Sequence, residues 1–256
     1  MGLFETEIAD GVLTIRWNRP DALNSLRLEM YQGAAEHVRA AADDPAVRVV
    51  VLTGEGRAFS AGADIAQDRP VGPGRLAPLE AGNALVETII GLPKPVVAAV
   101  NGLAAGIGAT IALSCDLVIA KRSSYFLLAF ANIGLMPDGG ATLLVPAAVG
   151  RPRAARMALL GERIPAATAL EWGLVSHVVD DAAFEAEVAA VVTKLAHGPT
   201  QSYARTKAAL AASTLALLQQ AHAIECAGQD ELFDTADFAE GVAAFREKRV
   251  ARFAGR

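Results

Sequence analysis

The sequence predicts an α/β fold with an α-helical C-terminal region, and two features indicate it. Short apolar runs typical of buried strands alternate with helical patterns over roughly the first 180 residues. From Asp181 onward the pattern is helical throughout. With 256 residues, 53% of them hydrophobic, the chain can bury one large core. We therefore expect a core at 1–195 and a helical region at 196–256 that packs on this core and on a neighbouring subunit.

The first predicted elements are a β-hairpin and a helix. Leu3–Ile8 and Val12–Trp17 flank Asp10-Gly11, a residue pair typical of a two-residue hairpin turn. A helix should follow that is capped by Asn24 or Ser25 and ends near residue 42, where two aspartates and a proline stop it.

The rest of the core is predicted as strands and helices in turn. Strands are expected at residues 47–52, 96–100, 117–120, 125–128 and 174–179, from their apolar runs. Helices are expected at residues 79–90, 104–113, 141–149, 151–160 and 166–172. Gln67–Pro78 is rich in proline and glycine, which favours an irregular loop. In the helical tail, breaks are expected near Gly198-Pro199 and Ala227–Asp230.

Composition narrows the functional classes. A net charge of −5 and a pI near 5.4 argue against a protein that coats nucleic acid by bulk charge. No apolar run has the length of a membrane span, and the N-terminus shows no secretory pattern, so a cytoplasmic protein is expected. Cys115 lies in an apolar run, and it and Cys226 are expected to be free thiols.

Two glycine-bearing turns carry most of the functional information. Val49–Thr53 leads into Ala61-Gly62-Ala63-Asp64, and Val96–Val100 leads into Asn101–Gly108. Each has the pattern of a buried strand, a tight turn and the start of a helix, which leaves backbone N–H groups unpaired. Two such groups aimed at one point would hold a developing oxyanion. The second turn is not a dinucleotide fingerprint, because Ile111 stands at the third glycine position.

On these turns and further motifs, the sequence resembles the crotonase (enoyl-CoA hydratase/isomerase) superfamily. The similar stretches cover nearly the whole chain in the family's order: Asn18–Asn24, Gly56–Ile65, Lys94–Gly108, Ser114–Leu117, Gly161–Val175 and Ala244–Arg249. The resemblance implies a spiral of ββα repeats and a helical C-terminal region that forms homotrimers or hexamers. It also implies an acyl-CoA thioester as substrate, with coenzyme A as part of that substrate and no permanently bound cofactor.

The resemblance assigns roles to several residues. The N–H groups of Ala63 and Ile107 would form an oxyanion hole for the thioester carbonyl. Relatives commonly have glycine at the second position, so the Ile107 side chain should face away from the thioester. Coenzyme A would be contacted by two further sets of residues, the second reaching it from a neighbouring subunit: Ala22, Ala61, Asp64 and Ile65, and then Phe245 and Lys248.

The sequence departs from the superfamily's hydratases at two positions. Those enzymes carry two catalytic glutamates, where this chain has Thr110 and Phe130. Adding water across a double bond needs a base for the water and an acid for the carbon. A conventional hydratase is therefore not expected.

Asp138 is the remaining acid-base candidate. Its residue type suits an N-cap of the helix that begins near Gly140. However, Phe130–Gly140 is similar to Asp-dependent isomerases of the superfamily, such as dienoyl-CoA isomerases and above all the phenylacetate-pathway epoxide–oxepin isomerase. One carboxylate is sufficient for an isomerase, since it can remove a proton and return it elsewhere. Apolar neighbours such as Ile107 and Met136 would raise its pKa.

We therefore predict an acyl-CoA isomerase that acts through a thioester enolate. The alternatives are a hydratase-like lyase with a different acid and a non-catalytic acyl-CoA-binding paralogue in which Asp138 is only a cap. Glu80 and Glu87 are expected to be solvated, although either could assist proton transfer. No metal is expected, because the histidines are scattered without ligand spacing: His37, His177, His197 and His222.

Overall fold

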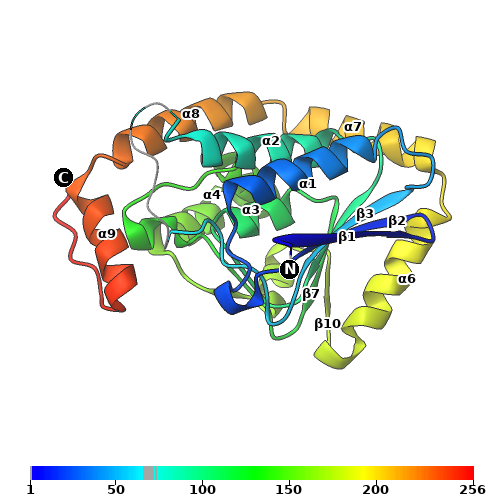
Figure 1. Ribbon diagram of the computed structural model, residues 1–256, viewed down its shortest axis with the longest axis horizontal. Coiled ribbons are helices and arrows are strands. Elements are labelled where there is room, and N and C mark those ends of the chain that lie inside the picture. Colours follow the sequence, from blue (N-terminus) through cyan, green and yellow to red (C-terminus); the bar gives the residue numbers. More distant parts are fainter. Residues whose placement is uncertain (1, 66–71, 73) are drawn as a thin grey trace.

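The computed structural model describes residues 2–65, 72 and 74–256, and its strands form two sheets (Figure 1). Within the described residues, the larger sheet has six strands in the order β1-β2-β3-β5-β7-β10 and the smaller has four in the order β4-β6-β8-β9. The larger sheet comprises β1 (Phe4–Ala9), β2 (Val12–Trp17), β3 (Val49–Gly54), β5 (Val96–Val100), β7 (Leu117–Lys121) and β10 (His177–Val179). The smaller comprises β4 (Ala58–Ser60), β6 (Leu103–Ala105), β8 (Tyr125–Leu127) and β9 (Ile164–Pro165).

Consecutive strands contribute in turn to the two sheets. β3, β5 and β7 run parallel in the larger sheet, while β4, β6 and β8, which follow them, run parallel in the smaller sheet. A helix follows each of the first two strand pairs, namely α2 (Ala77–Gly91) and α3 (Ile107–Leu113). The predicted spiral of ββα repeats is confirmed, and the C-terminal ends of the short strands meet at one edge of the smaller sheet.

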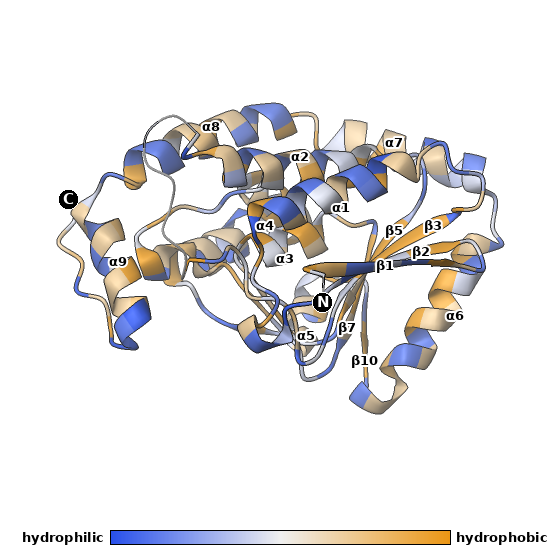
Figure 2. Cartoon of the chain, viewed as in Figure 1, coloured by the Kyte–Doolittle hydropathy of each residue, from blue (hydrophilic) through white to orange (hydrophobic). Residues whose placement is uncertain are grey.

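The helices cover both faces of the larger sheet. α1 (Leu28–Ala40), α2 and α7 (Thr200–Thr214) lie along one side of the molecule, and α6 (Phe184–Ala196) lies on the opposite face of the sheet (Figure 1). Alternation along β3 follows this arrangement: Val50 and Leu52 belong to the main core, whereas Val49 and Val51 contact the α6 side. β5 and the first four residues of β3 are apolar, as expected for strands buried on both faces (Figure 2).

The remaining helices complete the α-helical part of the fold. They are α4 (Ala141–Leu160), α5 (Ala166–Trp172), α8 (Leu218–Leu232) and α9 (Ala236–Glu247), with short 3₁₀ turns at Pro20–Ala22, Ala129–Ile133 and Asp181–Ala183. Gly150 has φ 75° and ψ 160°, which interrupts α4 where two separate helices were predicted. Among the described residues, no helix combines the length and apolar content that crossing a membrane requires. Cys115 and Cys226 are free thiols, as predicted.

The N-terminal hairpin is confirmed, but the predicted cap of the first helix is wrong. Asp10 and Gly11 have φ of 50° and 82°, the left-handed pair that a type I′ turn needs. α1 begins only at Leu28, after a residue that makes no side-chain cap. Asn24 is instead fully buried at φ 56° and accepts a hydrogen bond from the Arg19 N–H at 2.8 Å. Its side chain is therefore committed to a turn rather than to a helix end.

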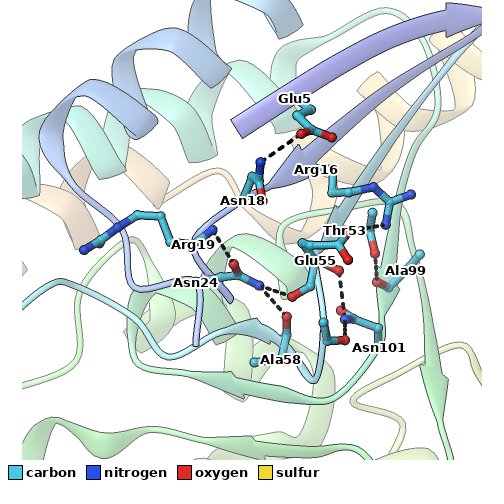
Figure 3. A network of polar contacts seen from close by, with 12 residues as sticks. Glu5, Arg16, Asn18, Arg19, Asn24, Thr53, Glu55, Ala58, Ala99 and Asn101 are labelled. Atoms are coloured by element: carbon cyan, nitrogen blue, oxygen red, sulfur yellow. Dashed lines mark hydrogen bonds and ion pairs between the residues drawn. The ribbon is translucent and has the colours of Figure 1, made fainter. Parts of the chain in front are cut away.

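The same amide fixes the first glycine turn (Figure 3). Asn24 Nδ2 donates to the carbonyl oxygens of Glu55 and Ala58, at 2.9 and 2.7 Å. From the other side, Asn101 Nδ2 donates to the carbonyl oxygens of Gly54 and Gly56, both at 2.8 Å. Two side-chain amides thus hold the turn that leads from β3 to β4 and on to Ala63.

Three other expectations need correction. The strand expected at 174–179 forms only at His177–Val179, because the Leu174 N–H closes the end of α5 on the Ala169 carbonyl. The helix expected from residue 104 begins at Ile107, because residues 103–105 form β6. No break occurs at 227–230, where α8 is continuous. Residues 67–71 and 73 of the predicted loop 67–78 lie outside the described residues, and α2 already begins at Ala77.

The helical tail packs on its own core through an ion pair between the buried Lys207 and the partly accessible Asp116. Lys207 of α7 donates to Asp116 Oδ2 at 2.8 Å and to the Ile89 carbonyl, near the end of α2, at 2.7 Å. Asp116 also accepts from the Val96 N–H at 2.7 Å. Burial raises the pKa of Asp116, and the Lys207 charge opposes that rise. This pair joins α7 to the end of α2 and, through Asp116, to β5, which leads into the second glycine turn.

Candidate active site

The two glycine turns lie against each other at the edge of the smaller sheet. A Cβ atom added at Gly62 would lie 2.8 Å from the Ala105 carbonyl oxygen and 3.5 Å from Gly106 Cα. Gly62 has φ 91° and Gly106 has φ 52°, so both adopt backbone conformations that other residues rarely reach. The close approach needs glycine, and it brings together the residues that follow, Ala63 and Ile107.

The backbone N–H groups of Ala63 and Ile107 are available for a ligand. Leu26 donates to the Gly62 carbonyl at 2.8 Å and accepts from the Asp64 N–H at 2.9 Å, and this parallel bridge leaves the N–H of Ala63 pointing away. Ile107 is the first residue of α3, so its N–H has no partner within the helix. Among the described residues neither group donates a hydrogen bond. Two such donors can stabilise an oxyanion.

The Ile107 side chain is buried between α2 and the turn that contains Asp138. It is 6% exposed, and its Cδ1 would lie 3.5 Å from a Cβ atom added at Gly82 of α2. A Cβ atom at Gly139 would overlap Ile107 Cδ1, and Gly139 has φ 71°. Only glycine therefore fits beside Asp138, and the Ile107 side chain connects the second turn to it.

Asp138 is hydrogen-bonded to α3 by its backbone carbonyl and to α8 by its carboxylate. Thr110, which is fully buried in α3, donates to the Asp138 carbonyl oxygen at 3.2 Å. Gln229 Nε2 of α8 donates to Asp138 Oδ2 at 3.1 Å and to the Met136 carbonyl at 2.7 Å. The second glycine turn, Thr110 and Asp138 are thus neighbours, and the carboxylate points towards α8.

A different carboxylate occupies the N-terminus of α4, so the interpretation of Asp138 as a cap is wrong. Glu225 of α8 accepts from the Gly140 N–H at 2.7 Å and from the Thr142 N–H and hydroxyl at 2.9 and 2.6 Å. Glu225 is fully buried. Because it satisfies the first amides of α4, the side chain of Asp138 is not needed there.

The sequence predictions missed Glu225 and Gln229, although their spacing carries a signal. Together with His222 they occur at positions i, i+3 and i+7 of α8, so they share one face of this helix. All three are at most 5% exposed. A polar face turned inward is unusual for a helix that packs on a core.

The two positions of the hydratase glutamates lie around the second turn. Thr110 is fully buried beside Asp138, as described above, and Phe130 is 6% exposed. The Phe130 ring atom Cζ would lie 3.8 Å from a Cβ atom at Gly106. An uncharged hydroxyl and an apolar ring thus occupy this part of the candidate site.

The two glutamates of α2 differ from each other. Glu80 is exposed, and the Glu87 side chain, which is 37% exposed, in addition binds His222 Nδ1 at 2.7 Å. His222 is 5% exposed, and its Nε2 has no hydrogen-bond partner among the described residues. No group of three or more His, Cys, Asp or Glu side chains in the described part of the chain is arranged to hold a metal ion.

The residues assigned to coenzyme A fall into two regions. The Ala61 N–H donates to the Leu23 carbonyl at 2.9 Å, which places Ala61 next to the short turn that ends at Ala22. The Asp64 carboxylate is 8% exposed and ion-paired with Arg19 and Arg27 at 2.9 and 3.1 Å.

The second region is α9, which lies at the far end of the molecule from the six-stranded sheet (Figure 1). Phe245 is 56% exposed on this helix, and Lys248 ends it with φ 55°. These two residues thus lie on α9 and its C-terminal end, whereas Ala61 and Asp64 follow β4 of the smaller sheet.

Comparisons with known proteins agree with this fold. A family model described as enoyl-CoA hydratase/isomerase matches residues 7–256, and the chain belongs to this family. It is 41% identical to the 1,2-epoxyphenylacetyl-CoA isomerase of Escherichia coli K12, over 98% of each chain. It is also 41% identical to a probable enoyl-CoA hydratase of Rhodobacter capsulatus, over 98% of this chain and 97% of that one. A crystal structure of an enoyl-CoA hydratase from Mycobacterium avium subsp. paratuberculosis superposes with a TM-score of 0.93 at 47% identity, covering 99% of both chains.

Proposed function

We propose that this enzyme is an acyl-CoA isomerase with Asp138 as its proton shuttle. The observation that carries the proposal is the placement of Asp138, whose backbone is bound to α3 directly behind the second glycine turn. Its carboxylate is not used as a helix cap, because Glu225 has that role. The E. coli relative named as an isomerase of an acyl-CoA supports the same reaction class.

In this mechanism the thioester oxygen binds to the N–H groups of Ala63 and Ile107. Asp138 removes a proton from the acyl chain, and the negative charge moves to the thioester oxygen, where the two N–H groups stabilise it. The carboxyl group then returns the proton to another carbon, so the substrate's composition is unchanged. Each donor of such a hole is worth about 10²–10³ in rate.

Coenzyme A would be held on the first glycine turn, at Ala22, Ala61, Asp64 and Ile65. Because the Asp64 carboxylate is ion-paired with Arg19 and Arg27, its contact with the pantetheine would come from the backbone. Phe245 and Lys248 would contact the nucleotide part of a coenzyme A molecule that is bound to a neighbouring subunit. No permanently bound cofactor takes part, and the enzyme would act in the cytoplasm.

A hydratase-like lyase is the second candidate, since the R. capsulatus relative with that name is equally similar. Such an enzyme would need a second acid-base group, and Glu87 paired with His222 is the candidate for it. We favour the isomerase because Thr110 and Phe130 cannot activate water.

The first test measures turnover of a panel of acyl-CoA thioesters by mass spectrometry. We expect products of unchanged mass. We expect crotonyl-CoA hydration to be slower than isomerisation by at least about 10²-fold, since Thr110 and Phe130 stand where a hydratase has its two acid-base groups. A hydrated product, heavier by one water, formed as fast as the isomer would contradict the proposal and favour the lyase.

The assembly is expected to be a trimer, or a pair of trimers. Large apolar side chains of the helical tail are exposed in the single chain: Leu210, Leu217, Ile224 and Phe245. Burying them against neighbouring subunits would remove apolar surface from water. Sedimentation at micromolar protein should therefore show a trimer or hexamer, and a stable monomer of 26.5 kDa would contradict this expectation.

A further inference from the structure

Gln229 connects α8 to the proposed catalytic carboxylate. It is 1% exposed, and its amide nitrogen makes two hydrogen bonds with the Asp138 turn. Nε2 donates to the Met136 carbonyl at 2.7 Å and to Asp138 Oδ2 at 3.1 Å. A single side chain thus holds the backbone two residues before Asp138 and the carboxylate itself.

Packing alone does not account for an amide at this position. Gln229 Oε1 is buried and has no hydrogen-bond partner among the described residues. A buried carbonyl oxygen without a partner destabilises a protein, whereas an apolar residue of similar size would avoid that cost. What the amide adds is its pair of donated hydrogen bonds, one of which ends on the Asp138 carboxylate.

The helix that carries Gln229 is held firmly in place. A Cβ atom at Gly228 would overlap Met136 Sδ, so glycine lets α8 lie directly on the Asp138 turn. One turn earlier, Glu225 binds the first amides of α4. The Asp138 turn therefore meets α8 at three successive points, and Gln229 is the one that reaches the carboxylate.

We propose that Gln229 is a positioning residue that assigns different tasks to the two oxygens of Asp138. The proposal rests on the function proposed for Asp138. An amide N–H can donate but cannot accept, so Oδ2 remains an acceptor whether Asp138 is ionised or protonated. The proton taken from the substrate carbon is consequently carried by Oδ1 and returned from Oδ1. Gln229 thereby keeps the carboxylate in one orientation through both proton transfers.

Other titratable groups near this contact lie on two helices. They are Cys226 and Glu225 on α8 and Glu80 on α2. The charges of Glu225, Glu80 and Asp138 act at the Cys226 thiol. Burial raises the pKa of Cys226, with these carboxylates adding to the rise, so the thiol stays neutral at working pH. Gln229 is thus a neutral donor beside the Asp138 carboxylate.

The test is a double-mutant cycle of Gln229→Met with Asp138→Asn in the full-length enzyme. Methionine keeps the volume and removes the donor, so kcat should fall about 10- to 10²-fold with KM nearly unchanged. In the Asp138→Asn background the same change should have no further effect, since Gln229 acts through the carboxylate. Gln220→Met, at an exposed position of α8, is the matched control and should keep the parental kcat.

The outcomes separate the two proposals. If Asp138→Asn is inactive while Gln229→Met matches the control, the positioning role is overturned and the function of Asp138 stands. If Asp138→Asn keeps full turnover, the proposed function itself fails. Should Gln229→Met not fold, Gln229→Glu preserves the shape and places a like charge beside Asp138, which should move the acidic limb of the kcat profile to higher pH. An unmoved limb would overturn the role.

Discussion

Replacing Asp138 by asparagine is expected to lower isomerisation by at least roughly 10²-fold, the low end for a positioned acid-base group. An amide cannot take up the substrate proton. The asparagine carbonyl can still accept the hydrogen bond from Gln229 Nε2, so the local geometry should persist. α4 keeps its cap in this variant because Glu225 provides it.

The measurement should separate chemistry from binding and folding. We expect acyl-CoA affinity and the thermal midpoint of Asp138→Asn to remain close to those of the parent, because the proposed oxyanion hole and the proposed nucleotide contacts involve other residues. Asp43→Asn, at an exposed position after α1, is a matched control for the charge change. Turnover of the Asp138 variant at the rate of this control would leave another base, such as Glu87, as the explanation.

The parts of the fold that depend on local sequence were predictable. The hairpin follows from two residues with positive φ at Asp10-Gly11. The buried strands follow from continuous apolar runs, because a strand covered on both faces needs no alternation of polar and apolar residues. The two turns were predictable because glycine is needed where Gly62 approaches Ala105. Each of these features is determined by a few consecutive residues or by one close contact.

The missed parts depend on contacts between distant segments. Glu225 lies 83 residues from Thr142, Gln229 lies 91 residues from Asp138, and His222 lies 135 residues from Glu87. From its residue type alone, Asp138 was as good a cap as any, and only the fold shows that α8 supplies another carboxylate.

The break predicted at residues 227–230 failed for the same reason. Gly228 does not end a helix; its missing side chain leaves room for Met136 Sδ. Its role belongs to the packing of α8 on the Asp138 turn, which no local pattern reports.

Replacing Glu225 by alanine should have the largest effect on stability. It would leave the N–H groups of Gly140 and Thr142 and the Thr142 hydroxyl without their acceptor, in a place where Glu225 itself is fully buried. An unsatisfied buried donor costs about 1–3 kcal/mol. The Gly140 N–H is such a donor, whereas Thr142 is exposed and water can replace Glu225 at its two groups. We expect the free energy of unfolding to fall by about 2–3 kcal/mol, a large loss for a single substitution.

Urea denaturation followed by circular dichroism would measure this change. Glu231→Ala, at an exposed position of the same helix, controls for the loss of a carboxylate and should change stability by less than about 0.5 kcal/mol. Glu225→Gln keeps one acceptor oxygen but presents an NH₂ group to the other donors, so its loss should lie between the two. Gly140 lies two residues after Asp138. Loss of the hydrogen bonds at the N-terminus of α4 should therefore also increase the mobility of the Asp138 carboxylate and lower kcat of the folded protein. If Glu225→Ala were as stable as Glu231→Ala, the end of α4 would not depend on Glu225, and Asp138 would again be a candidate for its cap.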